Sequence, residues 1–326
     1  MFNGTKAMKD TPSKLHSREI LAFAATLLVI AVWGETFVSS KILLQHGMAP
    51  SDIFFCRFLL AYLCMWILPD RRLFASSLKD EGRLAIAGLF GGTLYFLTEN
   101  TALQYSTASN VAILVSSTPV ITAVLVSIVH KEQRLSLVQV GASALSFIGM
   151  VLVVLNGKFI LHLSPKGDAL ALGAALSWSI YSLNLQDLRK KYDVRFITRK
   201  VFFYGIVTLL PYFLIVKPFS LDIQALSHPA VWGNLLYLGL VASMLCYVLW
   251  NWSIGILGTV RTSNMLYSQP FFTMLVAFII LGERITWMAV AGASLIIAGM
   301  VIFERSPKRV LPEQNESRSR EDGTDF

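Results

Sequence analysis

The feature that most limits which folds this chain can adopt is a series of apolar runs. Each run is about twenty residues long, and short polar segments separate them. A helix needs about 20 residues to cross a hydrocarbon core roughly 30 Å thick. The chain is 55% hydrophobic and 15% charged, with a mean hydropathy of +0.60, whereas soluble domains carry about 25% charged residues. The runs predict an all-α integral membrane protein with ten transmembrane helices, at 20–44, 51–68, 83–105, 107–129, 136–156, 168–190, 194–216, 229–254, 258–281 and 286–303.

The basic residues predict the orientation of these helices. With the N-terminus in the cytoplasm, 22 of the 28 Lys and Arg residues lie on the cytoplasmic side and 4 lie outside. Short cytoplasmic loops of membrane proteins are enriched in positive charge. We therefore expect a multi-pass protein of a bacterial-type inner membrane with both termini cytoplasmic, namely an N-terminal arm over 1–19 and a disordered polar tail over 305–326. The net charge of +8 reflects this topology and does not indicate nucleic-acid binding.

An internal repeat divides the chain. When 100–143 is compared with 251–294, at an offset of 151 residues, nine of 44 positions are identical, and most of them are Pro, Gly, Asn, Glu, Ser or Thr. Such matches indicate a duplication. The units are predicted at 20–156 and 168–304, joined by a linker at 157–167. Because each unit holds five spans, the second enters the membrane from the opposite side. Such inverted five-helix repeats are typical of secondary transporters.

Three stretches resemble a known family: "VWGETFVSSK", "TENTALQYSTASNVAILVSSTPVITAVL" and "QPFFTMLVAFIILGERITWMAVAGASLIIAGM". They are similar to EamA-type permeases of the drug/metabolite transporter superfamily, and the similarity covers about 20–304. The resemblance implies a ten-helix bundle, alternating access, and export of small metabolites, amino acids or drugs. It also implies that helices 1, 3, 4, 6, 8 and 9 line a central cavity. The chain departs from many members at Glu35, which follows "WG".

Four charged residues lie inside the predicted spans: Glu35, Lys41, Arg57 and Glu99. A charge at the centre of a bilayer costs about 2.5–3.5 kcal/mol on insertion scales, so the four would cost on the order of 10 kcal/mol if they were unpaired in lipid. At 1.5 Å per residue all four fall in the outer half of the bilayer. We expect them to face one another, water or a solute. One alternative is that Arg57 only links the first three helices by ion pairs. The other is a pocket of both charge signs, which suits a zwitterion such as an amino acid.

Helix-breaking and polar aromatic residues add candidates for this pocket. Pro119 and Pro270 fall inside helices 4 and 9, where each removes a backbone donor, so these points should face protein or a wet cavity. Neighbouring Ser, Thr, Tyr and Gln side chains could satisfy the freed carbonyl groups. The further candidates for solute or ion binding are Trp33, Tyr95, Asn100, Trp178, Tyr181, Asn251 and Tyr267. Packing alone is the alternative interpretation of the aromatic residues.

The sequence offers no motif for enzymatic chemistry. It contains no phosphate-binding loop and no His-Glu-x-x-His motif, and neither its five His nor its three Cys residues have metal-ligand spacing. We therefore predict a secondary-active exporter of a small metabolite or amino acid, with no cofactor, no metal and a proton as the candidate coupling ion. The alternatives are an exchanger of nucleotide sugars or phosphorylated solutes, a membrane enzyme acting on lipid carriers, and a non-transporting membrane adaptor. Substrate identity, direction, stoichiometry and oligomeric state are not encoded in recognisable motifs.

Overall fold

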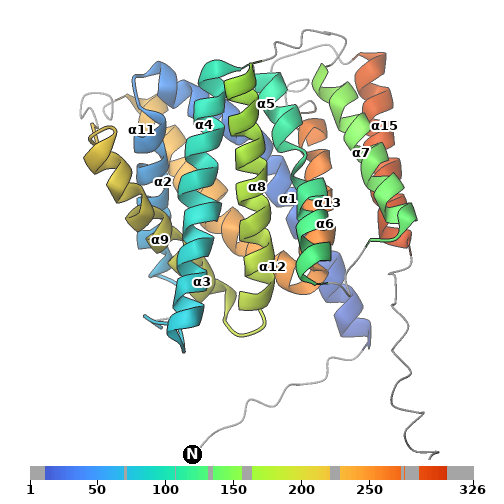
Figure 1. Ribbon diagram of the computed structural model, residues 1–326, viewed down its shortest axis with the longest axis horizontal. Helices are drawn as coiled ribbons and strands as arrows, with labels where there is room; N and C mark the ends of the chain where they lie inside the picture. The colour runs from blue at the N-terminus through green and yellow to red at the C-terminus, as the bar shows by residue number, and fades with distance from the viewer. Residues whose placement is uncertain are drawn as a thin grey trace, which may run out of the picture.

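A computed structural model of the chain describes residues 12–69, 72–106, 108–130, 135–155, 164–220, 228–272, 275 and 286–306. Within these residues the structure is helical and contains no strand. The elements are α1 (Pro12–Gln45), α2 (Pro50–Met65), α3 (Leu78–Gly88), η1 (Leu89–Leu94), α4 (Tyr95–Tyr105), α5 (Ala108–Val115), α6 (Thr118–Val129), α7 (Leu137–Leu155), α8 (Pro165–Leu188), α9 (Val194–Ile215), α11 (Pro229–Leu236), η3 (Tyr237–Leu245), α12 (Cys246–Leu257), α13 (Thr259–Asn264), η4 (Met265–Ser268) and α15 (Trp287–Arg305). The helices stand side by side in one bundle (Figure 1).

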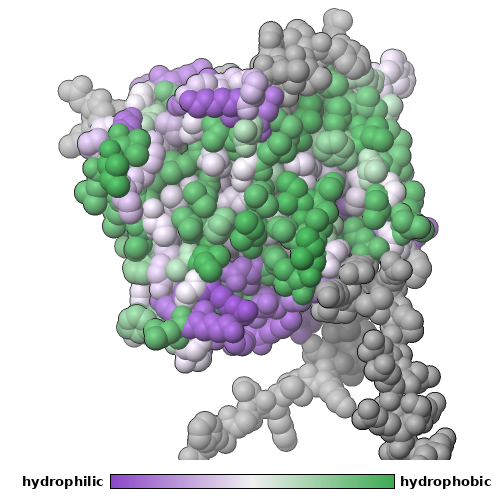
Figure 2. All heavy atoms as spheres, in the orientation of Figure 1, coloured by the Kyte–Doolittle hydropathy of each residue, from purple (hydrophilic) through white to green (hydrophobic). Residues whose placement is uncertain are grey.

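The outer surface of the bundle suits a bilayer. Hydrophobic residues cover the middle of the face in Figure 2, and hydrophilic residues gather at its two ends. Large apolar side chains such as Leu137 and Leu214 are almost fully exposed. Five described helices are long and apolar enough to cross a membrane: Ser17–Thr36, Leu137–Leu155, Val194–Ile215, Pro229–Leu257 and Trp287–Arg305. The prediction of helical, membrane-spanning structure is confirmed at this level, while the number of crossings stays a prediction.

The helix boundaries differ from the sequence prediction in several places. The first helix begins at Pro12 instead of residue 20, so the last part of the predicted N-terminal arm is helical. The predicted fourth span breaks into α5 and α6 just before Pro119. The predicted ninth span is described as helix only as far as residue 272, apart from residue 275. Most of the predicted linker and all but two residues of the predicted tail lie outside the described residues.

Two spans contain a π-helical segment that the sequence did not predict. Residues 89–94 (η1) interrupt the third span, and residues 237–245 (η3) interrupt the eighth. Glycines in these segments allow close packing: a Cβ on Gly92 would lie 2.9 Å from Phe58, and one on Gly239 would lie 2.6 Å from Leu60. A π-helical segment frees carbonyl groups from the regular hydrogen-bond pattern and often marks a functional site. Here the segments occupy corresponding places in the two predicted repeats.

Helices α7 and α15 form a pair at one edge of the bundle (Figure 1). Their backbones touch at Gly149 and Gly292, since a Cβ on either residue would lie 2.5 Å from the carbonyl oxygen of the other. Gly299 is equally crowded, by Ala142 and Ser146. Small residues at a helix–helix contact allow this close approach in membranes. The pair meets the rest of the bundle chiefly through α5 and η4.

A polar network ties the elements at one end of the bundle, which we call the α8–α9 end after the connection at residues 189–193. Lys200 forms an ion pair with Glu81, which also accepts a hydrogen bond of 2.5 Å from the Tyr204 hydroxyl. Asp80 accepts hydrogen bonds from the Tyr192 hydroxyl (2.9 Å) and Lys191 (3.1 Å). These bonds hold the pKa of Asp80 below its ordinary value of 3.8. Their contribution to stability is therefore present at neutral pH and is lost as the pH falls below about 4.

Replacing Glu81 with Gln is expected to destabilise the protein by roughly 3 kcal/mol, because it leaves the mostly buried Lys200 charge without its partner. Thermal unfolding in detergent measures this effect. The matched control is Glu19→Gln, whose 3.5 Å pair with Arg261 is partly exposed and should contribute less than about 1 kcal/mol. Equal losses in the two variants would contradict a stabilising role for the buried pair.

Candidate functional site

A pocket lies where the two predicted repeats meet. Its inner space is about 70 Å³, and one water needs roughly 10–15 Å³ by the same measure. It can therefore hold a few waters or one end of a small solute. Both repeats contribute to its lining, which consists of Trp33, Thr36, Arg57, Tyr95, Phe96, Glu99, Val115, Ser116, Thr118, Trp178, Tyr247, Leu266 and Gln269.

Two opposite charges face this pocket from α2 and α4. The Arg57 side chain is only 4% exposed; its Nε donates to Ser243 Oγ at 2.8 Å, and its Cζ lies 4.5 Å from the centre of the Phe96 ring. Glu99 is 7% exposed and accepts a 2.7 Å hydrogen bond from the Tyr95 hydroxyl. Among the described residues no carboxylate lies within ion-pair distance of Arg57. The prediction that Arg57 links helices through ion pairs to Glu35 or Glu99 is therefore not observed.

The other two charged candidates have different outcomes. Glu35 is half-buried, does not line the pocket, and its Oε1 has no hydrogen-bond partner among the described residues. Trp33 and Thr36, three residues apart, share the helix face that lines the pocket, and Glu35 lies on a neighbouring face of α1. Lys41 lies in α1, but its side chain lies outside the described part of the chain. Of the four charges that were expected to converge, the structure places Arg57 and Glu99 on the pocket and Glu35 outside its lining, and the prediction for Lys41 falls on a side chain that the structure does not describe.

The proline residues mark breaks that border the pocket. Helix α5 ends at Val115 and α6 begins at Thr118, with Pro119 in its first turn. The freed Val115 carbonyl accepts a 2.6 Å hydrogen bond from the Thr118 hydroxyl. In the second repeat the 3₁₀ segment η4 precedes Pro270, and Ser268 donates to the Met265 carbonyl at 2.7 Å. At the first break a side chain next to the proline thus satisfies the freed carbonyl, as the sequence suggested. At the second, the Leu266 carbonyl, four residues before Pro270, accepts a hydrogen bond from the Gln269 backbone N–H.

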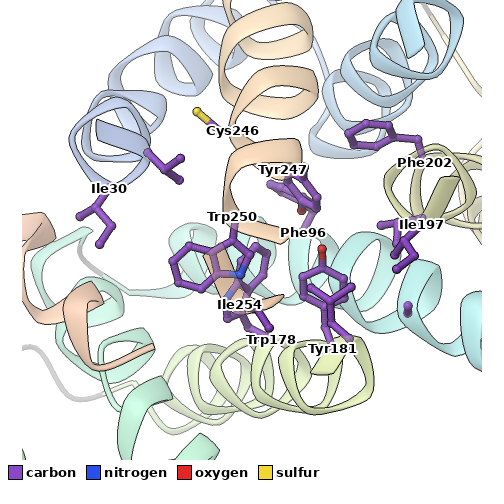
Figure 3. Packing of buried hydrophobic residues seen from close by; sticks show 14 of the residues in the cluster. Ile30, Phe96, Trp178, Tyr181, Ile197, Phe202, Cys246, Tyr247, Trp250 and Ile254 are labelled. Carbon is purple, nitrogen blue, oxygen red and sulfur yellow. The ribbon is translucent and has the colours of Figure 1, made fainter. Parts of the chain in front are cut away.

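Aromatic side chains gather beside the pocket, and Figure 3 shows four of them, Trp178, Tyr181, Tyr247 and Trp250, packed together. The Trp33 ring contacts the Trp178 ring edge-on at 5.2 Å, and lies 5.1 Å from the Trp250 ring. One helical turn beyond Trp178 and Tyr247 lie Tyr181 and Trp250, which are fully buried. This layer closes the pocket on the side where Tyr181 and Trp250 lie.

Three further candidates from the sequence lie outside the lining, in addition to Glu35, Tyr181, Pro119 and Pro270. Asn251 is fully buried below the pocket, where its Oδ1 accepts a 2.6 Å hydrogen bond from Tyr181 and its Nδ2 donates to Thr198 Oγ1 at 2.9 Å. Tyr267 is also buried, and its hydroxyl has no partner among the described residues. Asn100 is half-buried on α4 and does not line the pocket.

Tyr247 is the main pocket residue that the sequence analysis missed. It corresponds to Tyr95, but Tyr95 precedes Asn100 by five residues and Tyr247 precedes Asn251 by four, so an ungapped comparison does not align them. A comparison that allowed a gap of one residue could have found it. Ser243, which accepts the hydrogen bond from Arg57, lies inside the π-helical segment η3, and no sequence pattern marks it as a pocket residue.

Pocket residues also bind the π-helical segments of the opposite repeat. The Trp33 indole N–H, in the first repeat, donates to the Ala242 carbonyl of η3 at 2.9 Å. The Tyr247 hydroxyl, in the second repeat, donates to the Gly91 carbonyl of η1 at 2.7 Å, and Ser177 donates to the Phe90 carbonyl at 2.8 Å. Carbonyl groups in both segments, those of Phe90, Gly91 and Ala242, are therefore held by side chains of the other repeat.

Comparison with known proteins agrees with this architecture. The family model of EamA-like transporters matches residues 20–155 and 165–304, which is most of the chain. The chain belongs to the EamA-like transporter family. It is thus an EamA-type permease of the drug/metabolite transporter superfamily and a multi-pass membrane protein, and the family points to transport and not to enzymatic catalysis.

Relatives of this EamA-type permease are similar over nearly their whole length. An "Uncharacterized transporter" of Archaeoglobus fulgidus is 29% identical, with 88% of this chain and 98% of the relative covered. A "Probable amino-acid metabolite efflux pump" of Salmonella typhimurium is 28% identical, with coverage of 85% and 92%. A "Probable terminal-alkyne amino-acid exporter" of Streptantibioticus cattleyicolor is 25% identical, with coverage of 86% and 92%. A solved crystal structure shares the fold with a TM-score of 0.67 at 15% identity, covering 87% of this chain and 97% of the other.

The hydrogen bond of Trp33 in this permease can be tested by its removal. Trp33→Phe keeps an aromatic ring but leaves the Ala242 carbonyl without its side-chain donor, which is expected to cost about 1–3 kcal/mol beyond the effect of ring size. Trp250→Phe is the matched control, because the Trp250 indole N–H is buried without an acceptor among the described residues. Thermal unfolding of both variants measures the difference. A control variant that loses as much stability as Trp33→Phe would show that ring volume alone matters.

Proposed function

We propose that this permease is a secondary-active exporter of a small solute that carries both a negative and a positive charge, such as an amino acid. The supporting observation is the placement of Arg57 and Glu99 on one buried pocket without an ion pair between them. A solute carboxylate satisfies the Arg57 guanidinium through charge-assisted hydrogen bonds, and a solute ammonium group satisfies Glu99. The printed names of two relatives, an amino-acid metabolite efflux pump and an amino-acid exporter, support the same class of solute.

The mechanism we propose is alternating access between two inverted five-helix repeats. From the distribution of basic residues we infer that both termini are in the cytoplasm of a bacterial-type inner membrane, and in this orientation the α8–α9 end is cytoplasmic. The aromatic layer of Tyr181 and Trp250 then closes the pocket to the cytoplasm. In this mechanism the segments η1 and η3 are the flexible points of helices 3 and 8. A substrate that shifts Trp33 or Tyr247 changes the hydrogen bonds that hold them.

A proton is the coupling ion in this proposal. Glu99 is the only carboxylate among the described pocket-lining residues, so a proton and a solute ammonium group compete for it. Proton release to the cytoplasm would leave Glu99 free to bind the next solute. An exchanger of phosphorylated solutes would need several cations, whereas Arg57 is the only one that lines the described pocket.

A solute screen in proteoliposomes with an imposed pH gradient tests this function. We expect zwitterionic amino acids and related metabolites to move in response to the gradient, and phosphorylated sugars not to move. Conversion of a lipid-linked substrate without solute movement would instead support a membrane enzyme. An adaptor would neither bind nor move any of the solutes.

A further inference from the structure

Two contacts fix the guanidinium group of Arg57, and both leave the same part of it open. Its Nε donates to Ser243 Oγ at 2.8 Å, and its Cζ lies 4.5 Å from the centre of the Phe96 ring. Its two Nη groups donate no hydrogen bond to the described residues, and neither is shut off from the pocket that Arg57 lines. Because a guanidinium group binds a carboxylate through two parallel N–H donors, Nη1 and Nη2 are the pair that remains for a solute.

Ser243 is the hydrogen-bonding anchor of this side chain. Among the described residues it is the one hydrogen-bond partner of Arg57, and it is fully buried. Water therefore cannot take its place if the hydroxyl group is removed. Since a buried donor that loses its acceptor is costly, the long Arg57 side chain is then expected to leave this orientation.

Close packing between α2 and η3 brings the two residues together. Leu60 lies about one turn after Arg57 on α2, and Gly239 lies about one turn before Ser243 in η3. A Cβ on Gly239 would lie 2.6–3.1 Å from three side-chain atoms of Leu60, so a larger residue there would push the two helices apart. Glycine at this position therefore allows Arg57 to reach Ser243.

The position of Ser243 is fixed in turn by the first repeat. Its neighbour Ala242 accepts the 2.9 Å hydrogen bond from the Trp33 indole N–H. Arg57 and Trp33 both belong to the predicted first repeat, whereas Ala242 and Ser243 belong to the second. The orientation of Arg57 therefore depends on a contact between the two predicted repeats, and not on α2 alone.

We propose that Ser243 is a positioning residue of the solute site, which holds the Arg57 guanidinium group so that Nη1 and Nη2 both face the negative group of the solute. This inference rests on the proposed function, in which Arg57 binds a carboxylate. Ser243 does not line the pocket and therefore acts through Arg57. It sets the affinity for the solute and the preference for a free carboxylate over an uncharged ester, while it has no part in binding the ammonium group at Glu99.

Counterflow in proteoliposomes tests this role, and its probes are the zwitterionic amino acid that moves fastest in the solute screen and the methyl ester of that amino acid. Ser243→Ala should raise the half-saturation concentration of the amino acid about tenfold, because a hydrogen bond to a charged group is lost. The half-saturation concentration of the ester should stay within about a factor of two, so the preference for the free carboxylate falls. Discrimination against the N-acetyl derivative should stay at the wild-type level.

Two further variants separate the hydrogen bond from general effects on packing. Ser253→Ala is the matched control, because Ser253 is equally buried and donates to the Ala22 carbonyl at 3.2 Å outside the pocket lining. It should keep the wild-type preference for the free carboxylate. Ser243→Cys keeps a weak acceptor, so it should lose part of this preference, but less than Ser243→Ala.

An unchanged preference in Ser243→Ala, or in Ser243→Cys if Ser243→Ala does not fold, would overturn the positioning role. A larger loss in Ser243→Cys than in Ser243→Ala would also overturn it, because side-chain volume would then decide the effect. If Arg57→Gln loses the preference in the same assay while the Ser243 variants keep it, the proposed function stands and only the role of Ser243 fails. If Arg57→Gln keeps the preference, or if no zwitterion moves in the screen, the proposed function fails as well.

Discussion

Replacing Arg57 with Gln is expected to lower solute counterflow in proteoliposomes by about 100-fold at subsaturating solute concentration. Truncating one partner of a buried charge pair costs roughly 2–5 kcal/mol, and each 1.4 kcal/mol is about a factor of ten. In the proposed complex the solute carboxylate would lose its counter-ion, because Arg57 is the only cation among the described pocket-lining residues. The measurement is the initial rate of counterflow of the solute identified by the screen.

The control for this variant is Arg83→Gln. Arg83 lies at the α8–α9 end, 4.0 Å from Asp187, with about a third of its side chain exposed. It should retain counterflow within a factor of two or three, because an exposed pair of this kind contributes less than about 1 kcal/mol. Full activity of Arg57→Gln, in protein that unfolds at the normal temperature, would show that Arg57 does not bind the solute.

Replacing Glu99 with Gln is expected to abolish transport driven by a pH gradient. Gln can neither release a proton nor pair with an ammonium group, so the variant loses both the coupling ion and one half of the solute site. The measurement is solute movement in proteoliposomes with and without an imposed pH gradient. We expect the gradient to have no effect on the variant.

Glu35→Gln is the matched control for Glu99→Gln, since both carboxylates lie within the predicted spans but only Glu99 lines the pocket. It should keep its response to the pH gradient. Loss of coupling in Glu35→Gln together with normal coupling in Glu99→Gln would show that the wrong carboxylate has been assigned to the proton.

The charges illustrate what the sequence could predict about this site. The cost of burying an ion in hydrocarbon was sufficient to single out Arg57 and Glu99, and both lie on one pocket. The same argument included Glu35, whose side chain lies on a neighbouring face of α1. Depth in the membrane follows from counting residues, but the rotation of a helix about its axis does not. The apolar residues of α1 are distributed around its whole circumference, so no polar stripe marks the face that turns inward.

Some of the backbone irregularities could be predicted from the sequence, and others could not. Pro119 and Pro270 have a defined effect on a helix, and the breaks next to them could be predicted from the residue type alone. The π-helical segments could not, because the stretches around Gly91 and Gly239 read as parts of continuous apolar runs. Their hydrogen-bond partners, Trp33 and Tyr247, come from the opposite repeat. Such contacts depend on how the two repeats pack and cannot be derived from either repeat alone.

The central claim is that Arg57 binds the negative group of the solute and Glu99 binds the positive one. The most direct measurement compares counterflow of the identified solute with that of its carboxylate ester and its N-acetyl derivative, in wild type, Arg57→Gln and Glu99→Gln. The account predicts that Arg57→Gln no longer distinguishes the ester from the parent solute, and that Glu99→Gln no longer distinguishes the N-acetyl derivative. Wild-type discrimination against both derivatives in both variants would contradict it.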